Sequence, residues 1–214
     1  MLKTQFKDHL DFDIYLEIQK IRQEKGYLTV SERNQLKSML EKNYKPTFIK
    51  EEKPKLPIIT DINFLRQPCA EVTEEDNIKE IIQKLRDTLE GYDGYALSAP
   101  QIGIYKKISY CKIPYYNQNN KKLEEKEVIL INPKIIEHDR KIIIKQEGCL
   151  SIPNLRIDTN RWVFITLINH NEKFEPQTFM SQDLEGLILQ HEIDHLNGKL
   201  IIDRKHVDIN YRKK

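Results

Sequence analysis

The apolar positions divide the chain into a helical N-terminal segment, a long middle segment of short strands, and a final helix. Residues 10–23 fit a helical spacing only loosely, whereas residues 29–40 predict a better marked helix, with Thr29 and Glu32 at capping-box spacing. Residues 42–57 combine three prolines with five lysines, and proline disfavours a helix just before it. We therefore predict that residues 1–55 form a helical extension that ends in a Pro/Lys-rich linker.

After the linker, the pattern predicts a helix, several strands and a second helix. A stripe of isoleucines and leucines predicts a helix that Thr73 caps and that ends near Gly91. Residues 104–113, 128–131, 135–145 and 161–169 have β-like patterns, and the polar residues 115–126 indicate a hairpin loop. Residues 183–196 predict a helix that Asn197 and Gly198 stop. Strands between two helices favour one α+β domain, over residues 56–214.

The composition indicates a folded domain with a highly charged surface. Hydrophobic residues make up 39% and charged residues 32%, and no run of 18 apolar residues predicts a membrane span. A net charge of +2 gives no overall attraction to nucleic acid. The basic tail that begins at Lys199 is read as a solvated end, with a weak RNA-facing role as the alternative.

The number of cysteines and the composition of the N-terminus predict a reducing compartment. Three cysteines are an odd number, and no apolar secretory segment opens the chain, so we expect no disulfide framework and a reducing cytoplasm. Acidic residues near the N-terminus argue against a mitochondrial presequence. Targeting to an organelle stays open as the alternative.

The final helix contains His191-Glu192-Ile193-Asp194-His195, an HExxH motif. Residues four apart lie on one helical face, so both imidazoles can bind one metal ion, while Glu192 can reach a water on that ion. Three fixed residues match by chance at roughly one position in 8,000, so the motif has meaning chiefly because it lies on a helix.

A catalytic metal of this kind needs a third protein ligand and one open position. No histidine follows at a suitable spacing, and the candidate lies upstream, at Cys149, after a predicted strand and beside Gly148. The alternative is that Cys149 is a small buried hydrophobic residue, as free cysteines often are. Two nitrogens and one sulfur suit zinc or ferrous iron, and the ligand type does not decide between them.

With these motifs the chain resembles the peptide deformylases. Three segments match the family's motifs in order: Gly94-Tyr95-Ala96-Leu97-Ser98-Ala99-Pro100-Gln101, Glu147-Gly148-Cys149-Leu150-Ser151 and Gln190-His191-Glu192-Ile193-Asp194-His195-Leu196. The resemblance runs from about Leu56 to Asp203. It implies a compact α+β fold with the HExxH helix packed centrally among antiparallel strands. It also implies removal of the N-formyl group from the first methionine of new polypeptides.

The resemblance also implies a role for each matching residue. Cys149, His191 and His195 would hold one divalent metal ion, with ferrous iron expected and zinc as the alternative. Glu192 would take a proton from the metal-bound water and later give it to the leaving amine. The side-chain amide of Gln101 and the backbone N–H of Leu150 would stabilise the negative charge that develops on the formyl oxygen.

The substrate would be the N-terminus of a formyl-methionyl nascent peptide, with no membrane involved. Leu184, Leu187 and Ile188 share the helical face of His191, and they either line an apolar pocket for the methionine side chain or belong only to the core. The backbone of Gly94, Tyr95 and Ala96 would pair with an extended peptide. Gly148 and Arg156 complete the predicted substrate-binding set, a solvated surface arginine being the alternative for Arg156.

The chain departs from the family pattern at two positions in the first motif. Ala96 stands where the family has a second glycine, so peptide binding would weaken if this position needed a positive φ or a bare backbone. Ser98 stands where alanine is usual, and residues 1–55 have no counterpart in the deformylase core.

Two other functions fit parts of the sequence pattern. One is a zinc peptidase, which the upstream cysteine motif disfavours. The other is a ribosome- or peptide-binding protein that keeps the fold with little turnover. Because Glu192, Cys149 and Gln101 are all present, the sequence predicts an active enzyme.

Overall fold

The structure is a computed structural model that describes residues 56–119 and 121–207. The predicted N-terminal helices, the linker and the last residues of the basic tail lie outside these ranges. The helices are α3 (Ile62–Leu65), α4 (Ile78–Glu90) and α5 (Asp183–Leu196), with 3₁₀ turns η1 (Ala99–Ile102) and η2 (Ile201–Arg204). The strands are β1 (Ala96–Ser98), β2 (Ile108–Asn117), β3 (Lys122–Ile131), β4 (Lys134–His138), β5 (Lys141–Cys149), β6 (Ile152–Trp162), β7 (Phe164–His170) and β8 (Pro176–Gln182). Within the described part, no helix combines the length and apolar character needed to cross a bilayer.

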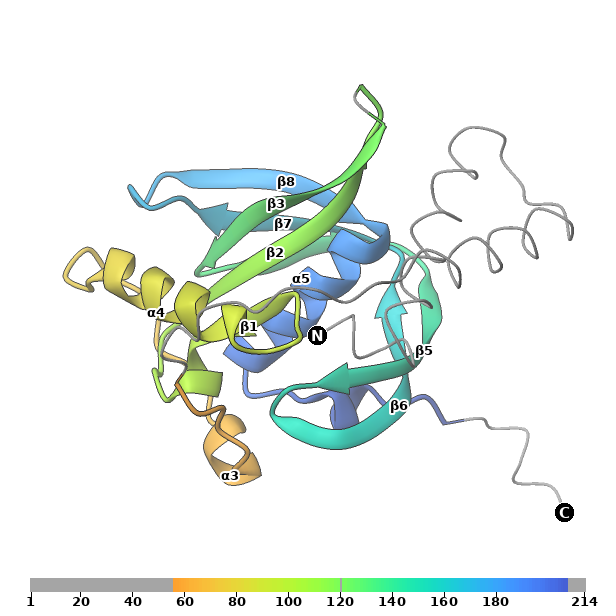
Figure 1. Ribbon diagram of the computed structural model, residues 1–214, viewed down its shortest axis with the longest axis horizontal. Helices are drawn as coiled ribbons and strands as arrows, with labels where there is room; N and C mark the ends of the chain where they lie inside the picture. Colours follow the sequence, from red (N-terminus) through yellow and green to blue (C-terminus); the bar gives the residue numbers. More distant parts are fainter. Residues whose placement is uncertain (1–55, 120, 208–214) are drawn as a thin grey trace, which may run out of the picture.

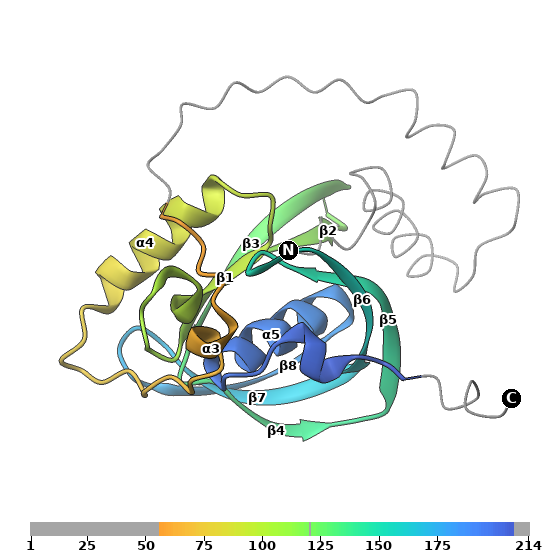
Figure 2. The same cartoon turned by 90° about the horizontal axis from the view of Figure 1, so that it is seen from below.

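The strands form three antiparallel sheets, with the orders β1-β2-β3, β4-β7-β8 and β5-β6 (Figure 1). Helix α5 packs against β1, β2, β6, β7 and β8. Figure 2 shows β7 and β8 on one side of α5 and the sheet of β1 to β3 on another. Mostly antiparallel strands with few helices confirm the predicted α+β class.

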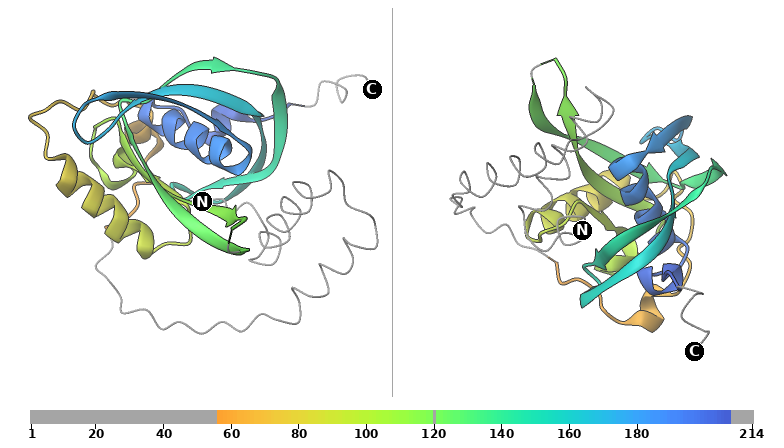
Figure 3. Two further views of the ribbon diagram at one scale, coloured as in Figure 1. Left: turned by 90° about the horizontal axis from the view of Figure 1, so that it is seen from above. Right: turned by 90° about the vertical axis from the view of Figure 1, so that its right-hand side faces the viewer.

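Strand β2 separates two apolar clusters. Its alternate residues Cys111 and Ile113 join α5 and β7 in the first cluster, whereas Ile108 and Tyr110 join α4 in the second. This division follows from the period of two, which points successive side chains to opposite faces of a sheet. The left view of Figure 3, seen from above, shows α4 and α5 well separated. All three cysteines are unpaired, as expected.

The predicted start of the first long helix is wrong. Helix α4 begins at Ile78, and its cap is Asn77, whose side chain accepts from the backbone N–H of Glu80. Thr73 instead donates to the Asp76 carboxylate through its backbone N–H at 2.8 Å and its hydroxyl at 3.1 Å. These bonds form a turn in which Thr73 is too far upstream to cap the helix.

Several predicted strand limits are also wrong. Residues 135–145 form parts of two strands, β4 and β5, which belong to different sheets. The chain changes sheet at Asp139, whose carboxylate accepts from the backbone N–H of Phe164 at 2.9 Å. Residues 161–169 likewise include the end of β6 and most of β7.

The predicted hairpin loop at residues 115–126 is mostly strand. β2 continues to Asn117, β3 starts at Lys122, and the two strands pair down to these residues. The segment forms strands although it is polar, because hydrogen bonds between its side chains stabilise the strand pair. Tyr115 and Asn117 both donate to the carboxylate of Glu124, at 2.6 and 2.8 Å.

Candidate metal centre

The three predicted metal ligands converge in the structure. His191 and His195 lie one turn apart on α5, with ring centroids 5.0 Å apart. Cys149 ends β5, and its Sγ lies 3.3 Å from Nε2 of His195. One ligand atom from each of the three side chains lies within 4.8 Å of the other two, and all three residues are buried. The helical spacing thus places two of the predicted ligands, and the end of a strand places the third beside them.

The chemistry of this donor set fits a divalent metal ion. Oε1 of Glu147 is 2.6 Å from Nδ1 of His191, whereas the buried Nε2 of His191 has no hydrogen-bond partner among the described residues. Burial alone raises the pKa of Cys149, but the neighbouring His195 and His191 outweigh it and lower this pKa to about 6. The thiolate is the form that binds metals. A thiolate and two imidazoles suit zinc or ferrous iron.

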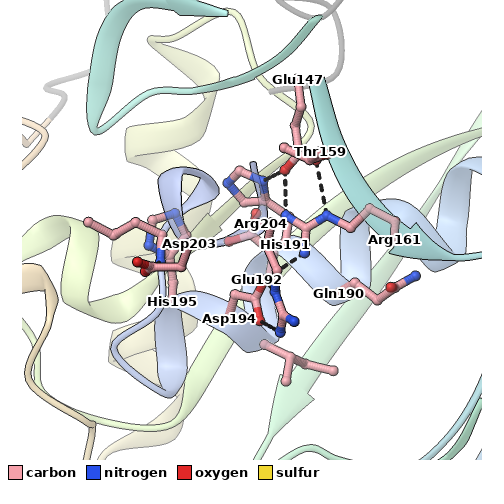
Figure 4. A network of polar contacts seen from close by, with 12 residues as sticks. Glu147, Thr159, Arg161, Gln190, His191, Glu192, Asp194, His195, Asp203 and Arg204 are labelled. Carbon is pink, nitrogen blue, oxygen red and sulfur yellow. Dashed lines mark hydrogen bonds and ion pairs between the residues drawn. The ribbon is translucent and has the colours of Figure 1, made fainter. Parts of the chain in front are cut away.

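A network of buried charged side chains contacts His191 through Glu147 (Figure 4). Arg161 contacts the Glu147 carboxylate through Nη2 at 2.5 Å and Nε at 3.0 Å, and Asp194 through Nη1 at 2.5 Å. Thr159 also donates to Glu147. Burial raises the pKa of Glu147, but the charge of Arg161 and the bond to His191 hold this pKa well below its usual range. Glu147 is therefore a carboxylate that can accept from Nδ1–H and leave Nε2 to a metal.

Sequence reasoning gave no role to Glu147, Thr159, Arg161 or Asp194. Glu147 and Asp194 lie inside the second and third motif segments, but no role was assigned to either. Arg204 was read as part of a solvated tail, yet it pairs with Asp194, through Nη2 at 2.5 Å and Nε at 2.9 Å. Asp194 could have indicated such a partner. It is an acidic residue inside a largely buried helix, and a buried charge needs a partner of opposite charge.

Glu192 is fully buried and held through one oxygen. Its Oε2 accepts from the hydroxyl of Ser98 at 2.6 Å, and its Oε1 is buried without a partner among the described residues. Gln101 is also buried, and its Oε1 accepts from the backbone N–H of Ser98 at 2.9 Å. The Gln101 amide donates to the hydroxyl of Ser151 at 3.1 Å. The first motif therefore contacts both of the others, and Leu150 lies directly after Cys149.

The predicted substrate-binding residues occupy two kinds of environment. Leu184 and Ile188 belong to the first core cluster, whereas Leu187 is half-buried and lies outside the core clusters. Gly148 is buried, and Arg156 is exposed on β6. Partial burial of its guanidinium lowers the pKa of Arg156, while the charge of Asp93, the residue before Gly94, opposes this shift. Arg156 thus lies within electrostatic reach of the segment that leads into β1.

Ala96 adopts an ordinary strand conformation. It pairs with Cys111, is absent from the described residues with positive φ, and is fully buried in the first core cluster. Gly94 precedes β1, and the backbone oxygen of Tyr95 accepts from Lys112 at 2.6 Å. The glycine-to-alanine departure therefore imposes no positive-φ strain, and the added methyl group fills core space.

Comparison with known proteins agrees with this geometry. Residues 56–210 match the family model described as polypeptide deformylase. The chain is 39% identical over 141 residues to peptide deformylase 1 of Nostoc sp., covering 65% of this chain and 73% of that protein. It is 36% identical over 141 residues to the peptide deformylase of Microchaete diplosiphon, with the same coverage of 65% and 73%.

Solved structures show the same fold. The crystal structure of peptide deformylase from Thermotoga maritima has a TM-score of 0.62 and 31% identity, covering 72% of this chain and 99% of that one. A Met-Ala-Ser-bound class I type b peptide deformylase from Acinetobacter baumannii has a TM-score of 0.62 and 26% identity, covering 71% and 99%. The family match over most of the residues shows that this chain belongs to the polypeptide deformylase family of enzymes.

Proposed function

We propose that the chain removes the N-formyl group from the N-terminal methionine of newly synthesised polypeptides by metal-dependent hydrolysis. The observation that carries the proposal is the convergence of Cys149, His191 and His195 beside the buried Glu192. The three residues would hold one divalent ion, and we propose Fe²⁺, with Zn²⁺ as the alternative. When bound, such an ion supplies an activated water at neutral pH and polarises a carbonyl oxygen.

The residues of the chain would divide the remaining work between them. Glu192 would accept a proton through Oε1, the oxygen left free by Ser98, and would return it to the leaving amine. The amide of Gln101 and the backbone N–H of Leu150 would donate to the oxygen that becomes negatively charged. The contact of Gln101 with Ser151 supports this role, because it brings the amide to the cysteine motif.

Substrate binding would use β1 and the face of α5. β1 lies at the edge of its sheet, so an extended peptide could pair with its backbone at Gly94 to Ala96. Leu187 would contact the methionine side chain, because it is half-buried and lies outside the core clusters. The Acinetobacter baumannii enzyme was solved with Met-Ala-Ser, a tripeptide that begins with methionine. That ligand supports a peptide N-terminus as the substrate here, in the cytoplasm where such chains are made.

The test is release of formate from formyl-Met-Ala-Ser by protein purified without oxygen and reconstituted with ferrous iron. We expect turnover in the wild type and a loss of about 10²-fold or more in Glu192→Gln, whose amide cannot accept the proton. Metal content should stay near one ion per chain in both proteins, because Glu192 is not among the proposed ligands. A folded wild type that holds the metal and releases no formate would refute the proposal.

A further inference from the structure

We propose that Ser98 is a positioning residue that fixes the orientation of Glu192 during proton transfer. The inference rests on the proposed function and concerns a position where the family usually has alanine. Ser98 ends β1, is the N-cap residue of the turn η1 and is fully buried. Its hydroxyl contacts Glu192 on α5. Because Ser98 is buried, water does not compete for this hydrogen bond.

The contacts define which way the hydroxyl proton points. Ser98 Oγ lies 2.6 Å from Oε2 of Glu192 and 2.7 Å from Oγ of Ser109, its register partner on β2. The Ser98 hydroxyl donates to this carboxylate oxygen, so Ser109 in turn donates to Ser98. A longer contact of 3.2 Å to the backbone oxygen of Glu192 competes for the same proton. The contact to the side-chain oxygen is the shorter of the two and has the better hydrogen-bond distance.

This pair of serines makes the two oxygens of Glu192 inequivalent. Oε2 is held by a donor that is itself held, whereas the buried Oε1 has no partner among the described residues. One fixed oxygen also fixes the plane of the carboxylate, and so the direction in which the other oxygen points. Small errors in the placement of a reacting group are costly to catalysis. Without the hydroxyl, the carboxylate can rotate about its last bond, and Oε1 loses its fixed direction.

The backbone of Ser98 acts on a different residue from its side chain. Its N–H donates to the side-chain oxygen of Gln101 at 2.9 Å. Alanine keeps this N–H and removes only the hydroxyl. Ser98→Ala therefore separates the orientation of the proposed base from the orientation of the proposed oxyanion donor.

The experiment compares kcat, KM and bound iron for the wild type, Ser98→Ala, Ser109→Ala and Ser181→Ala, with formyl-Met-Ala-Ser as substrate. We expect Ser98→Ala to lower kcat per bound metal about tenfold, a part of the total contribution of a general base, with KM and metal content nearly unchanged. Ser109→Ala should lower kcat less, because it removes only the outer donor. Ser181→Ala is the matched control: Ser181 is buried, its hydroxyl has no partner among the described residues, and its loss should leave kcat unchanged.

The outcomes separate this inference from the proposed function. Wild-type kcat per bound metal in Ser98→Ala would overturn the inference while leaving deformylation intact. A loss of turnover that only follows a loss of metal would also overturn it, since the role would then be structural. If Ser98→Ala failed to fold, an unchanged kcat in Ser109→Ala would overturn it. No turnover in metal-loaded wild type would instead refute the proposed function.

Discussion

Oε1 of Glu147 lies 2.6 Å from Nδ1 of His191, so the residue two before the cysteine of the second motif orients a histidine of the third. The same carboxylate accepts from Arg161 and Thr159, which lie on β6. Metal-ligating histidines commonly donate their second ring N–H to a carboxylate, which fixes the tautomer. The second and third motifs are thus connected by the contact between Glu147 and His191.

Glu147→Gln should weaken both metal binding and folding. A neutral amide orients His191 less well, and we expect iron affinity to fall about 10- to 100-fold. The variant also removes one partner of the buried Arg161, which keeps Asp194, so the free energy of unfolding should fall by about 3 kcal/mol. Metal titration and urea denaturation of the metal-free protein measure the two effects.

Glu125→Gln is the matched control for this substitution. Glu125 pairs with Lys112 at 2.6 Å on the surface, where both side chains are about 40% exposed. The loss of stability should therefore stay below about 1 kcal/mol, with no change in metal affinity. Equal losses in the two variants would contradict the importance assigned to the buried pair.

Leu187→Ala should affect the substrate more than the fold. If this side chain contacts the methionine, its truncation should reduce kcat/KM for a formyl-methionyl peptide about tenfold, mainly through KM. Leu184→Ala removes a core side chain one helical turn away and should cost about 2 to 5 kcal/mol of stability. Steady-state kinetics and thermal denaturation distinguish the two. An unchanged KM in Leu187→Ala would contradict the proposed contact between this residue and the methionine side chain.

Two glycines with positive φ allow a paired test of backbone packing. At Gly198, after α5, φ is +67° and an added Cβ would collide with the backbone oxygen of Arg66. At Gly103, φ is +84° and an added Cβ would meet nothing within 4 Å. Gly103→Ala should thus cost only the conformational penalty of about 1 to 2 kcal/mol, and Gly198→Ala clearly more. Urea denaturation of both proteins checks this, and equal costs would disprove the close approach.

Tyr110→Phe should reveal a contribution to stability that disappears at alkaline pH. Burial and the hydrogen bond to Glu127, at 2.6 Å, raise the pKa of Tyr110 to about 12. Because an unfolded tyrosine titrates near pH 10, the contribution is complete below about pH 10 and is lost as the pH rises through about 12. We expect a difference of about 1 kcal/mol between wild type and variant at neutral pH. Urea denaturation at a series of pH values should show this difference shrinking above about pH 10. A difference that stays constant would contradict the raised pKa of Tyr110.

The parts of the fold that follow from local pattern were predictable. Helix α5 has the predicted limits, because its apolar positions, its acidic first turn and Gly198 after its end are all local signals. Since the HExxH spacing needs only a helix, the convergence of His191 and His195 follows from the sequence alone. Cys149 was the upstream candidate for the third ligand, with a buried core residue as the alternative, and the family resemblance favoured the ligand. The structure brings its sulfur to His195.

Features that depend on distant residues were not predictable. The change of sheet at Asp139 depends on Phe164, and nothing in the local alternation of residues 135–145 records that contact. Arg161 looks like a surface residue in the sequence, yet it is 2% exposed because Glu147 and Asp194 neutralise it. Buried ion pairs of this kind join residues far apart in the chain, whereas the period of the sequence carries information only about near neighbours.

The ligands occupy two separate positions along the chain, with β6, β7 and β8 between them. During synthesis, Cys149 is made first, and both histidines and Glu192 come only with α5. A chain interrupted between Cys149 and α5 carries one of the three proposed ligands and lacks Glu192. The capacity to hold the metal would therefore be acquired late, when α5 has been made and can pack against the strands that precede it.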